Sequence, residues 1–252
     1  MKEERWDAIA DKYDDEVLSV FDHDRRGLVR EKIKKYGSRA LLASDLGCGL
    51  GKFLPLMASQ FKQVHACDYS EGLLENARRT NSDLENVGFA KVDLIHGSVR
   101  LPKVDFTLCV NVLLTPILAE RLSILKNMTR QLSRGGHLVL VVPSLESALY
   151  ANARLVQWNL RSGVAEIHAE SEGFRAEEPS GEEVARKGVV YAGDMKMKHF
   201  IREELTTIAD GLRLDTVSVE KLEYRWETEF KEPPGWMGEP FPWDWLAVFR
   251  KR

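Results

Sequence analysis

Apolar residues follow two different periods along the chain, and their alternation predicts an α/β fold. Near the amino terminus, Trp6, Ile9, Ala10 and Tyr13 recur at helical spacing, and a second helical stretch runs toward Gly37. Short, nearly continuous apolar runs follow, and they are predicted to be buried strands over residues 40–46, 63–68, 87–95, 104–110 and 137–142. Helices are predicted between these runs, over residues 53–61, after Ser70, and from residue 118 to Gly135 and Gly136, where the helix should stop. Strands alternating with helices of this length favour a parallel sheet that is covered on both faces.

The pattern becomes irregular after residue 143 and regular again near the carboxyl terminus. Residues 145–160 have helical spacing, whereas residues 163–198 are rich in Glu, Gly and Lys and contain few large apolar residues. We interpret the second stretch as an insertion or a mobile lid, since long structureless connections are uncommon in compact domains. Helical spacing returns around Leu205, and residues 217–226 and 243–249 are predicted to be two last strands joined as a hairpin.

These elements define the predicted fold class and its subdivision. The class is α/β, with a Rossmann-like, doubly wound sheet of about seven strands, mostly parallel, that ends in an antiparallel hairpin. A length of 252 residues suits one domain over residues 1–252. Within it, residues 1–37 are expected to form cap helices and residues 144–198 an inserted lid or acceptor region.

Composition and charge narrow the class of protein. Hydrophobic residues make up 44% of the chain and charged residues 30%, which is ordinary for a globular protein, and the formal net charge of −3 disfavours a nucleic-acid partner. The first residues contain no apolar secretion signal, and the apolar run 138–142 is too short for membrane insertion. Three cysteines, Cys48, Cys67 and Cys109, lack metal-ligand spacing and are interpreted as reduced thiols. We therefore expect a cytoplasmic protein without a metal.

A glycine-rich loop between a predicted strand and a predicted helix carries the main chemical signal. It contains Asp45, Gly47, Gly49 and Gly51, and the glycines allow a sharp turn and a close approach of backbone to a ligand. A nicotinamide-binding loop would need glycine where Lys52 stands, and Asp45 would repel a pyrophosphate. The loop therefore favours a different nucleoside ligand, although glycines alone would also serve a tight turn.

Two further acids end the second and third predicted strands. Asp68 could accept hydrogen bonds from both hydroxyls of a ribose, and Asp93 with the N–H of Leu94 could pair with an adenine edge. Asp45 could accept from a cationic amine. Because parallel strands end at the same edge of a sheet, the three acids should form one rim, which suits a ligand with positive charge.

At these residues the chain resembles a class I S-adenosylmethionine-dependent methyltransferase, in the broad group of small-molecule enzymes that includes the quinone-biosynthesis methyltransferases. The resemblance covers roughly residues 1–143 and 198–250. Its motifs are the glycine loop at 45–51, the acidic strand ends at 68–70 and 93–94, and the segments 6–14, 106–113, 132–138 and 199–205.

The resemblance implies a role for each candidate residue. Gly47 and Gly49 would face the methionine part of the cofactor, and Asp68 would hold the ribose. Tyr69 would pack on the adenine, although packing on the sheet edge is the alternative. Asp93 and Leu94 would contact the adenine, and Asn111 the amino-acid end. Tyr13 would reach the cofactor carboxylate, unless it serves only the apolar stripe of its helix.

The implied function is methyl transfer from S-adenosylmethionine to an oxygen, nitrogen or carbon of a small-molecule acceptor, with S-adenosylhomocysteine as product. Direct displacement needs no metal and no covalent intermediate, and a base only where the acceptor holds its proton tightly. His199 is the candidate base, with polarity at a predicted helix start as its alternative. A cofactor-binding regulator without turnover and a protein or RNA methyltransferase remain open alternatives, as does a homodimer.

Overall fold

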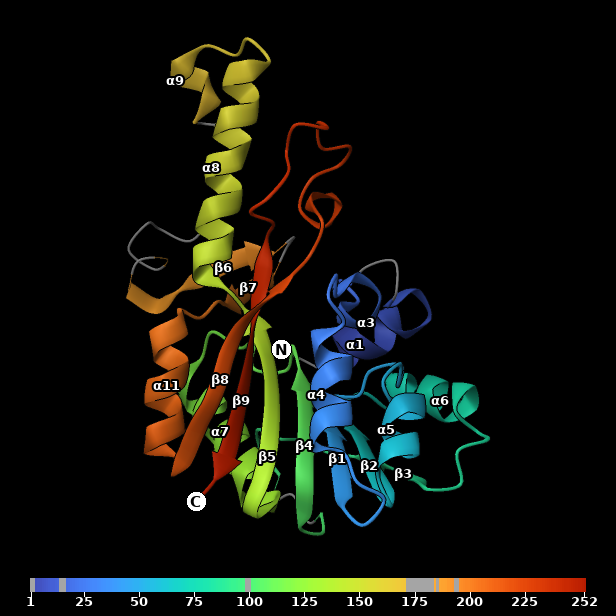
Figure 1. Cartoon of the computed structure of the whole chain (residues 1–252). Helices are drawn as coiled ribbons and strands as arrows, with labels where there is room; N and C mark the ends of the chain where they lie inside the picture. Colours follow the sequence, from blue (N-terminus) through green and yellow to red (C-terminus); the bar gives the residue numbers. More distant parts are fainter. Residues whose placement is uncertain (1–2, 14–16, 98–100, 171–183, 185, 193–194) are drawn as a thin grey trace.

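The computed structural model describes residues 3–13, 17–97, 101–170, 184, 186–192 and 195–252. Its centre is a seven-stranded sheet with the strand order β3-β2-β1-β4-β5-β9-β8 (Figure 1). The strands are β1 (Leu42–Leu46), β2 (Gln63–Asp68), β3 (Val87–Lys91), β4 (Val104–Val110), β5 (Leu132–Pro143), β8 (Leu214–Glu223) and β9 (Trp243–Lys251). The predicted Rossmann-like sheet is confirmed.

The direction of the strands places several chain segments at one edge of the sheet. Strands β1 to β5 pair in parallel, so their carboxyl ends share that edge. Strand β9 lies antiparallel between β5 and β8, with Asp244 opposite Pro143 and Trp243 opposite Glu223. The predicted carboxyl-terminal hairpin is confirmed, and the first residues of β9 join the edge at which the parallel strands end.

Helices cover both faces of the sheet. They are α1 (Glu3–Ile9), α3 (Val20–His23), α4 (Leu28–Tyr36), α5 (Leu54–Gln60), α6 (Glu71–Thr80), α7 (Leu118–Gln131), α8 (Leu145–Arg161), α9 (Glu166–Ala169) and α11 (Arg202–Gly211), with 3-10 turns η1 (Ala10–Lys12) and η3 (Trp226–Thr228). Alternate residues of β5 enter opposite cores: Leu138 and Leu140 pack with α7 and α11, whereas Val139 and Val141 pack with α4 and α5. This double burial explains the nearly continuous apolar strands of the sequence.

Two predicted boundaries were wrong. Helix α7 ends at Gln131 and β5 begins at Leu132, so the glycine pair lies within β5 and does not stop the helix. The pairing of β4 with β5 shifts there, and Gly135 takes a φ of +78° that a glycine adopts without strain. Strand β3 ends at Lys91 and not near residue 95, because the Asp93 carboxylate accepts the N–H groups of Ile95 and His96 at 2.7 and 3.0 Å and forms a turn.

The predicted insertion contains regular structure. Helix α8 extends beyond the carboxyl ends of the strands (Figure 1), and β6 (Val189–Ala192) pairs antiparallel with β7 (Met195–Lys198). Backbone hydrogen bonds from Lys198 to Leu114 (2.8 Å) and from Phe200 to Pro143 (2.8 Å) attach the end of this hairpin to the sheet. We expected an insertion or a mobile lid without regular structure over residues 163–198, and the lack of regular structure was wrong for the two strands of the hairpin. Residues 171–183, 185 and 193–194 of this prediction lie outside the described residues.

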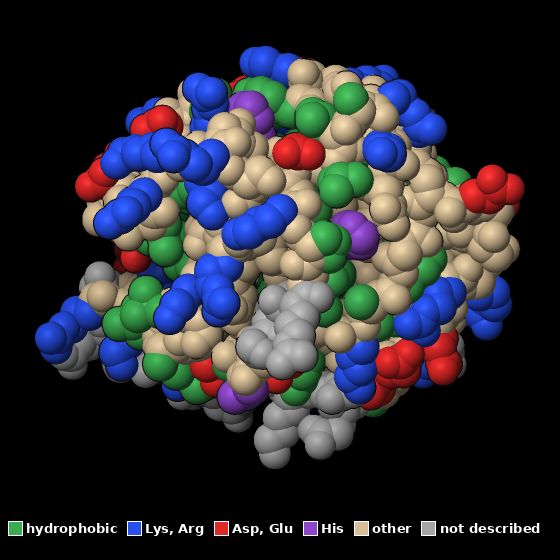
Figure 2. Space-filling model, turned by 90° about the horizontal axis from the view of Figure 1, so that it is seen from below, with side chains coloured by type: hydrophobic (Ala, Val, Ile, Leu, Met, Phe, Trp, Pro, Cys, Tyr) green, Lys and Arg blue, Asp and Glu red, His purple; other side chains and the backbone are tan. Residues whose placement is uncertain are grey.

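Charged side chains are unevenly distributed over the surface. Figure 2 shows the end of the molecule at which the parallel strands begin, where Lys and Arg side chains gather. This basic face is opposite the edge at which the strands end. In the described part of the chain, no helix is both long enough and apolar enough to span a membrane.

Candidate active site

The glycine loop is held tightly at the end of β1. The N–H groups of Gly47 and Cys48 both donate to the carbonyl of Cys67, at 2.7 and 2.9 Å, which ties the loop to β2. Gly47 has a φ of +77°, and a Cβ atom there would lie 2.1 Å from Cγ2 of Val112. Only glycine fits this position, because any side chain would meet the segment that follows β4.

Asp68 connects the end of β2 with the glycine loop. Its carboxylate accepts the N–H of Gly49 at 2.9 Å and the N–H of Ser70 at 3.0 Å. Burial raises the pKa of Asp68, and these backbone hydrogen bonds only partly offset that effect. Ser70 in turn caps α6 by accepting from the N–H of Leu73 at 3.1 Å, as its sequence position predicted.

Asp45 is a buried acid without compensation. Its side chain is on β1, 3% exposed, and receives no hydrogen bond from the residues that the structure describes. Burial, followed by the nearby charge of Asp68, raises the pKa of Asp45 to about 7. An acceptor group in this state favours the approach of a hydrogen-bond donor or a cation.

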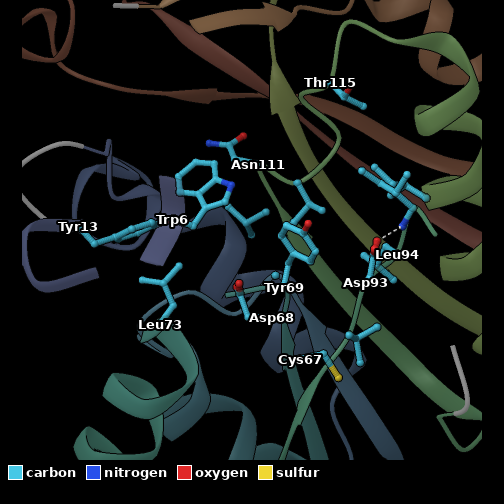
Figure 3. A pocket seen from close by; sticks show the side chains of 16 residues that line it. Trp6, Tyr13, Cys67, Asp68, Tyr69, Leu73, Asp93, Leu94, Asn111 and Thr115 are labelled. Carbon is cyan, nitrogen blue, oxygen red and sulfur yellow. Dashed lines mark hydrogen bonds between the residues drawn. The ribbon is translucent and has the colours of Figure 1, made fainter. Parts of the chain in front are cut away.

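A cavity of about 120 Å³ opens beside these residues at the carboxyl edge of the sheet. Figure 3 shows Trp6 and Tyr13 on one side of it and Asp93 and Leu94 on the other, with Tyr69 between them. The rings of Trp6 and Tyr13 lie 6.1 Å apart, so the amino-terminal segment contributes an aromatic wall. Burial acts to raise the pKa of Asp93, but hydrogen bonds from His96 and Ile95 outweigh it and lower that pKa.

A second cavity of about 940 Å³ adjoins the first. It extends between the amino-terminal segment, α8, the β6–β7 hairpin and the start of β9. The two cavities share lining residues, namely Trp6, Tyr13, Gly47, Val110 and Asn111. Asn111 has a φ of +52°, and its buried side-chain oxygen has no hydrogen-bond partner. One elongated ligand could therefore contact both cavities across this shared wall.

The structure brings the candidate residues of the sequence together. The smaller cavity is lined by seven of them: Tyr13, Gly47, Asp68, Tyr69, Asp93, Leu94 and Asn111. Asp45, Gly49 and the candidate base His199 line the larger cavity. His199 precedes α11 and is not at its start, and its Nδ1 lies 3.3 Å from the carbonyl oxygen of Met197. Burial lowers the pKa of His199 to about 4, so its imidazole is neutral at pH 7.

Sequence reasoning missed two acids of the larger cavity. Asp244 is 8% exposed and accepts a hydrogen bond from the Tyr224 hydroxyl at 2.6 Å, and Glu229 follows the η3 turn. Burial raises the pKa of Asp244 to about 6. The side chain of Glu229 is accessible to solvent, and desolvation by the surrounding cavity wall, followed by the charge of Asp244, raises its pKa to about 7. A signal was present for Asp244, because it is an acid between Trp243 and Trp245 in an otherwise apolar strand.

The comparisons with known proteins concern one family and one fold. Residues 44–140 match the family model of a methyltransferase domain. No curated protein sequence matches the chain.

Solved structures share the whole architecture at low identity. A SAM-dependent methyltransferase from Methanosarcina mazei is 18% identical, with a TM-score of 0.62 over 87% of this chain and 96% of that chain. The N-methyltransferase NodS from Bradyrhizobium japonicum, in complex with S-adenosylhomocysteine, is 16% identical, with a TM-score of 0.60 over 99% and 97%. DhpI, in a complex with SAM and HEP, is 18% identical, with a TM-score of 0.62 over 98% and 94%. At these identities the likenesses describe the fold.

Proposed function

We propose that this chain is a class I methyltransferase, and that it transfers the methyl group of S-adenosylmethionine to a small-molecule acceptor. The family match over residues 44–140 and the shared fold support the class. Two of the similar structures hold the cofactor or its product, which supports the same cofactor here. The single observation that carries the proposal is the pair of adjoining cavities at the carboxyl edge of the sheet. The narrower resemblance to quinone-biosynthesis enzymes stays a prediction.

The groups that line the smaller cavity fit the adenosine part of that cofactor. Asp68 offers acceptors for ribose hydroxyls, and Asp93 with Leu94 offers an acceptor beside a backbone N–H for the adenine edge. Tyr69 lines the same cavity and presents a ring against which a base can pack. We assign these four residues to the nucleoside.

The shared wall fits the amino-acid part. Gly47 and Gly49 keep the loop free of side chains, and a Cβ atom on Gly49 would lie only 3.5 Å from the Tyr13 hydroxyl. The buried carboxylate of Asp45 and the unpartnered oxygen of Asn111 are acceptors for an ammonium group. Tyr13 is assigned to the same end, since it lines both cavities.

When bound, S-adenosylmethionine supplies an electrophilic methyl group on a positive sulfur. What the chain adds is the placement of the two reactants and the exclusion of water, because direct displacement needs no nucleophile from the protein. His199 is the candidate base for an acceptor that must lose a proton. Its low pKa makes it a weak base, so an acceptor that is already nucleophilic is favoured.

The region over residues 144–198 contributes much of the larger cavity, and we propose that it encloses the acceptor. Leu149 of α8 and Tyr191, Met195 and Met197 of the β6–β7 hairpin line that cavity. The Lys- and Arg-rich face of Figure 2 is at the opposite end of the sheet, which favours a small molecule over a nucleic acid at this site. We treat residues 1–252 as one domain, with residues 1–37 as its cap.

Isothermal titration tests the cofactor site. We expect S-adenosylmethionine and S-adenosylhomocysteine to bind the wild type, and we expect Asp68→Ala to weaken both by about tenfold or more, because hydrogen bonds to a carboxylate are worth about 1.5–3 kcal/mol. Asp83→Ala is the matched control, since Asp83 is exposed in the turn after α6 and lines neither cavity. Absence of binding by both compounds at millimolar concentration, or binding of NADH in their place, would refute the proposal.

A further inference from the structure

We propose that the acceptor carries an ammonium group, and that Glu229 and Asp244 bind this group in the larger cavity. The inference rests on the proposed function, because it assigns a substrate class to the acceptor side of the same site. It concerns the ammonium group as the feature that is recognised, and it does not require that nitrogen to receive the methyl group.

The fold brings the two acids to the cavity from different elements. Asp244 is the second residue of β9 and lies opposite Pro143, the last residue of β5, so its carboxylate lies at the carboxyl edge of the sheet. Tyr224 and Asn111 hold it there through hydrogen bonds. Glu229 ends the η3 turn, which a backbone hydrogen bond from its N–H to the Trp226 carbonyl closes at 3.0 Å. Both acids line the larger cavity.

The charged lining of this cavity is predominantly acidic. Among the described residues, its titratable groups are Asp45, Lys52, His199, Glu229 and Asp244, besides the Cys48 thiol and the tyrosine hydroxyls. The Lys52 ammonium lies 2.6 Å from the Asp22 carboxylate, so its charge is largely committed to that pair. His199 is neutral at pH 7. Asp45 is assigned to the cofactor, so two carboxyl groups, Glu229 and Asp244, face the rest of a space in which no described cation is directed at them.

The electrostatics of the cavity also favour a cationic ligand. Asp45, which is assigned to the ammonium group of the cofactor, is 3% exposed and lines the same cavity. Desolvation raises the pKa of Asp45 and Glu229 to about 7 and that of Asp244 to about 6, which is the behaviour of acids that lack a cation. A bound ammonium group would favour their ionised forms and would be attracted by them.

The remaining wall fits an organic body attached to the ammonium group. Met195 and Met197 of the hairpin provide adaptable apolar surface, and Phe21 and Phe53 provide aromatic surface with ring centroids 5.1 Å apart. Leu149 adds an aliphatic side chain that is 56% exposed. A small apolar amine satisfies both halves of this lining, whereas a carboxylic acid of the same shape would be repelled by the acids.

The test compares three probes of equal length that differ in charge: 3-phenylpropylamine, 3-phenylpropan-1-ol and 3-phenylpropanoate. Each is titrated into protein saturated with S-adenosylhomocysteine at about pH 8, where the three acids are mostly ionised. We expect the ammonium probe to bind about tenfold or more tightly than the alcohol, and the carboxylate to bind most weakly.

Two variants assign this preference to residues. Glu229→Gln should weaken the ammonium probe by about tenfold and leave the alcohol unchanged, because only the cation loses a charged partner. Asp244→Asn should act in the same direction. Glu227→Gln is the matched control, since Glu227 is exposed in the same η3 turn and does not line the cavity. Thermal unfolding of each variant shows whether it has folded.

Three outcomes would overturn the inference: equal binding of the amine and the alcohol, tighter binding of the carboxylate, or no binding of the amine at millimolar concentration. The wild-type ranking alone decides this, so the inference stays testable if a variant fails to fold. Binding of S-adenosylhomocysteine is measured first in the same protein. If S-adenosylhomocysteine does not bind, the proposed function is refuted. If it binds but the protein shows no preference for the amine, only the inference is refuted.

Discussion

Replacing Asp45 with asparagine should stabilise the ligand-free protein relative to the wild type, by an amount that grows as pH rises. The same replacement should weaken cofactor binding. Burial raises the pKa of Asp45 from 3.8 to about 7. That difference is about three pK units, and each unit is worth about 1.4 kcal/mol, so ionisation of Asp45 costs the native state about 4 kcal/mol. Asparagine preserves the shape of the side chain and removes this cost.

The sign of the pH dependence follows from the protons bound in each state. Between the usual pKa of 3.8 and the native value of about 7, the native protein holds a proton on Asp45 that the unfolded chain has released. The free energy of unfolding of the wild type therefore falls as pH rises through this window and levels off above it. The variant lacks this pH-dependent contribution. A buried amide adds an offset that does not depend on pH. The decisive quantity is therefore the change with pH.

Urea denaturation of both proteins at about pH 5 and about pH 8 measures this change. Two of the three pK units lie between these conditions, so the advantage of Asp45→Asn should grow by about 3 kcal/mol from the lower to the higher pH. Titration of S-adenosylhomocysteine should meanwhile show binding weakened by about tenfold, because the amide is a poorer partner for a cation. Asp83→Asn, at an exposed position, is the control for both measurements.

A stability difference that is constant with pH would refute the argument that Asp45 is buried as an uncompensated acid. Unchanged cofactor affinity would instead remove Asp45 from the binding site while leaving the stability argument intact. The two measurements therefore separate the effect of the buried charge on stability from its effect on cofactor binding.

Three further predictions follow from single contacts. Gly47→Ala should lower the free energy of unfolding by about 2 kcal/mol or more, since its Cβ would meet Val112 at 2.1 Å, and an unchanged urea midpoint would contradict the steric argument. Tyr224→Phe should cost about 1–2 kcal/mol by leaving the buried carboxylate of Asp244 without its hydroxyl donor, as measured by thermal unfolding; a variant as stable as the wild type would show that the hydrogen bond contributes nothing. Because burial lowers the pKa of His199 to about 4, methyl transfer by the wild type and by His199→Gln should have pH profiles of the same shape between about pH 6 and pH 8, and an inflection present only in the wild type would contradict that assignment.

Local signals in the sequence were sufficient for the sheet and for one end of the site. Gly49 of the glycine loop and Asp68 are 19 positions apart, and their meeting follows from one strand–helix–strand unit, whose geometry is nearly always the same. Apolar runs identified the strands because both faces of each central strand are buried. The candidate residues Asp68, Asp93 and Asn111 could therefore be placed at the carboxyl edge of the sheet from the sequence alone.

Local sequence signals predicted the ends of some elements incorrectly where long-range strand pairing determined them. The glycine pair at 135–136 resembles a helix stop, yet the pairing of β5 with β4 extends the strand back to Leu132. Strand pairing is a long-range interaction, so local propensity does not determine where a strand begins. The β6–β7 hairpin was missed for a related reason, because its strands are only four residues long and form a separate two-stranded sheet.

The sequence by itself determined the class of fold, and it predicted which strand ends would meet at one edge, since both depend on residues close together in the chain. Only the tertiary structure decided what surrounds the second cavity. Trp6 reaches it from the amino terminus, His199 from the segment after the hairpin, and Asp244 from the start of β9. Their proximity depends on the antiparallel placement of β9 between β5 and β8, which burial of whole faces determines and no short stretch of sequence encodes.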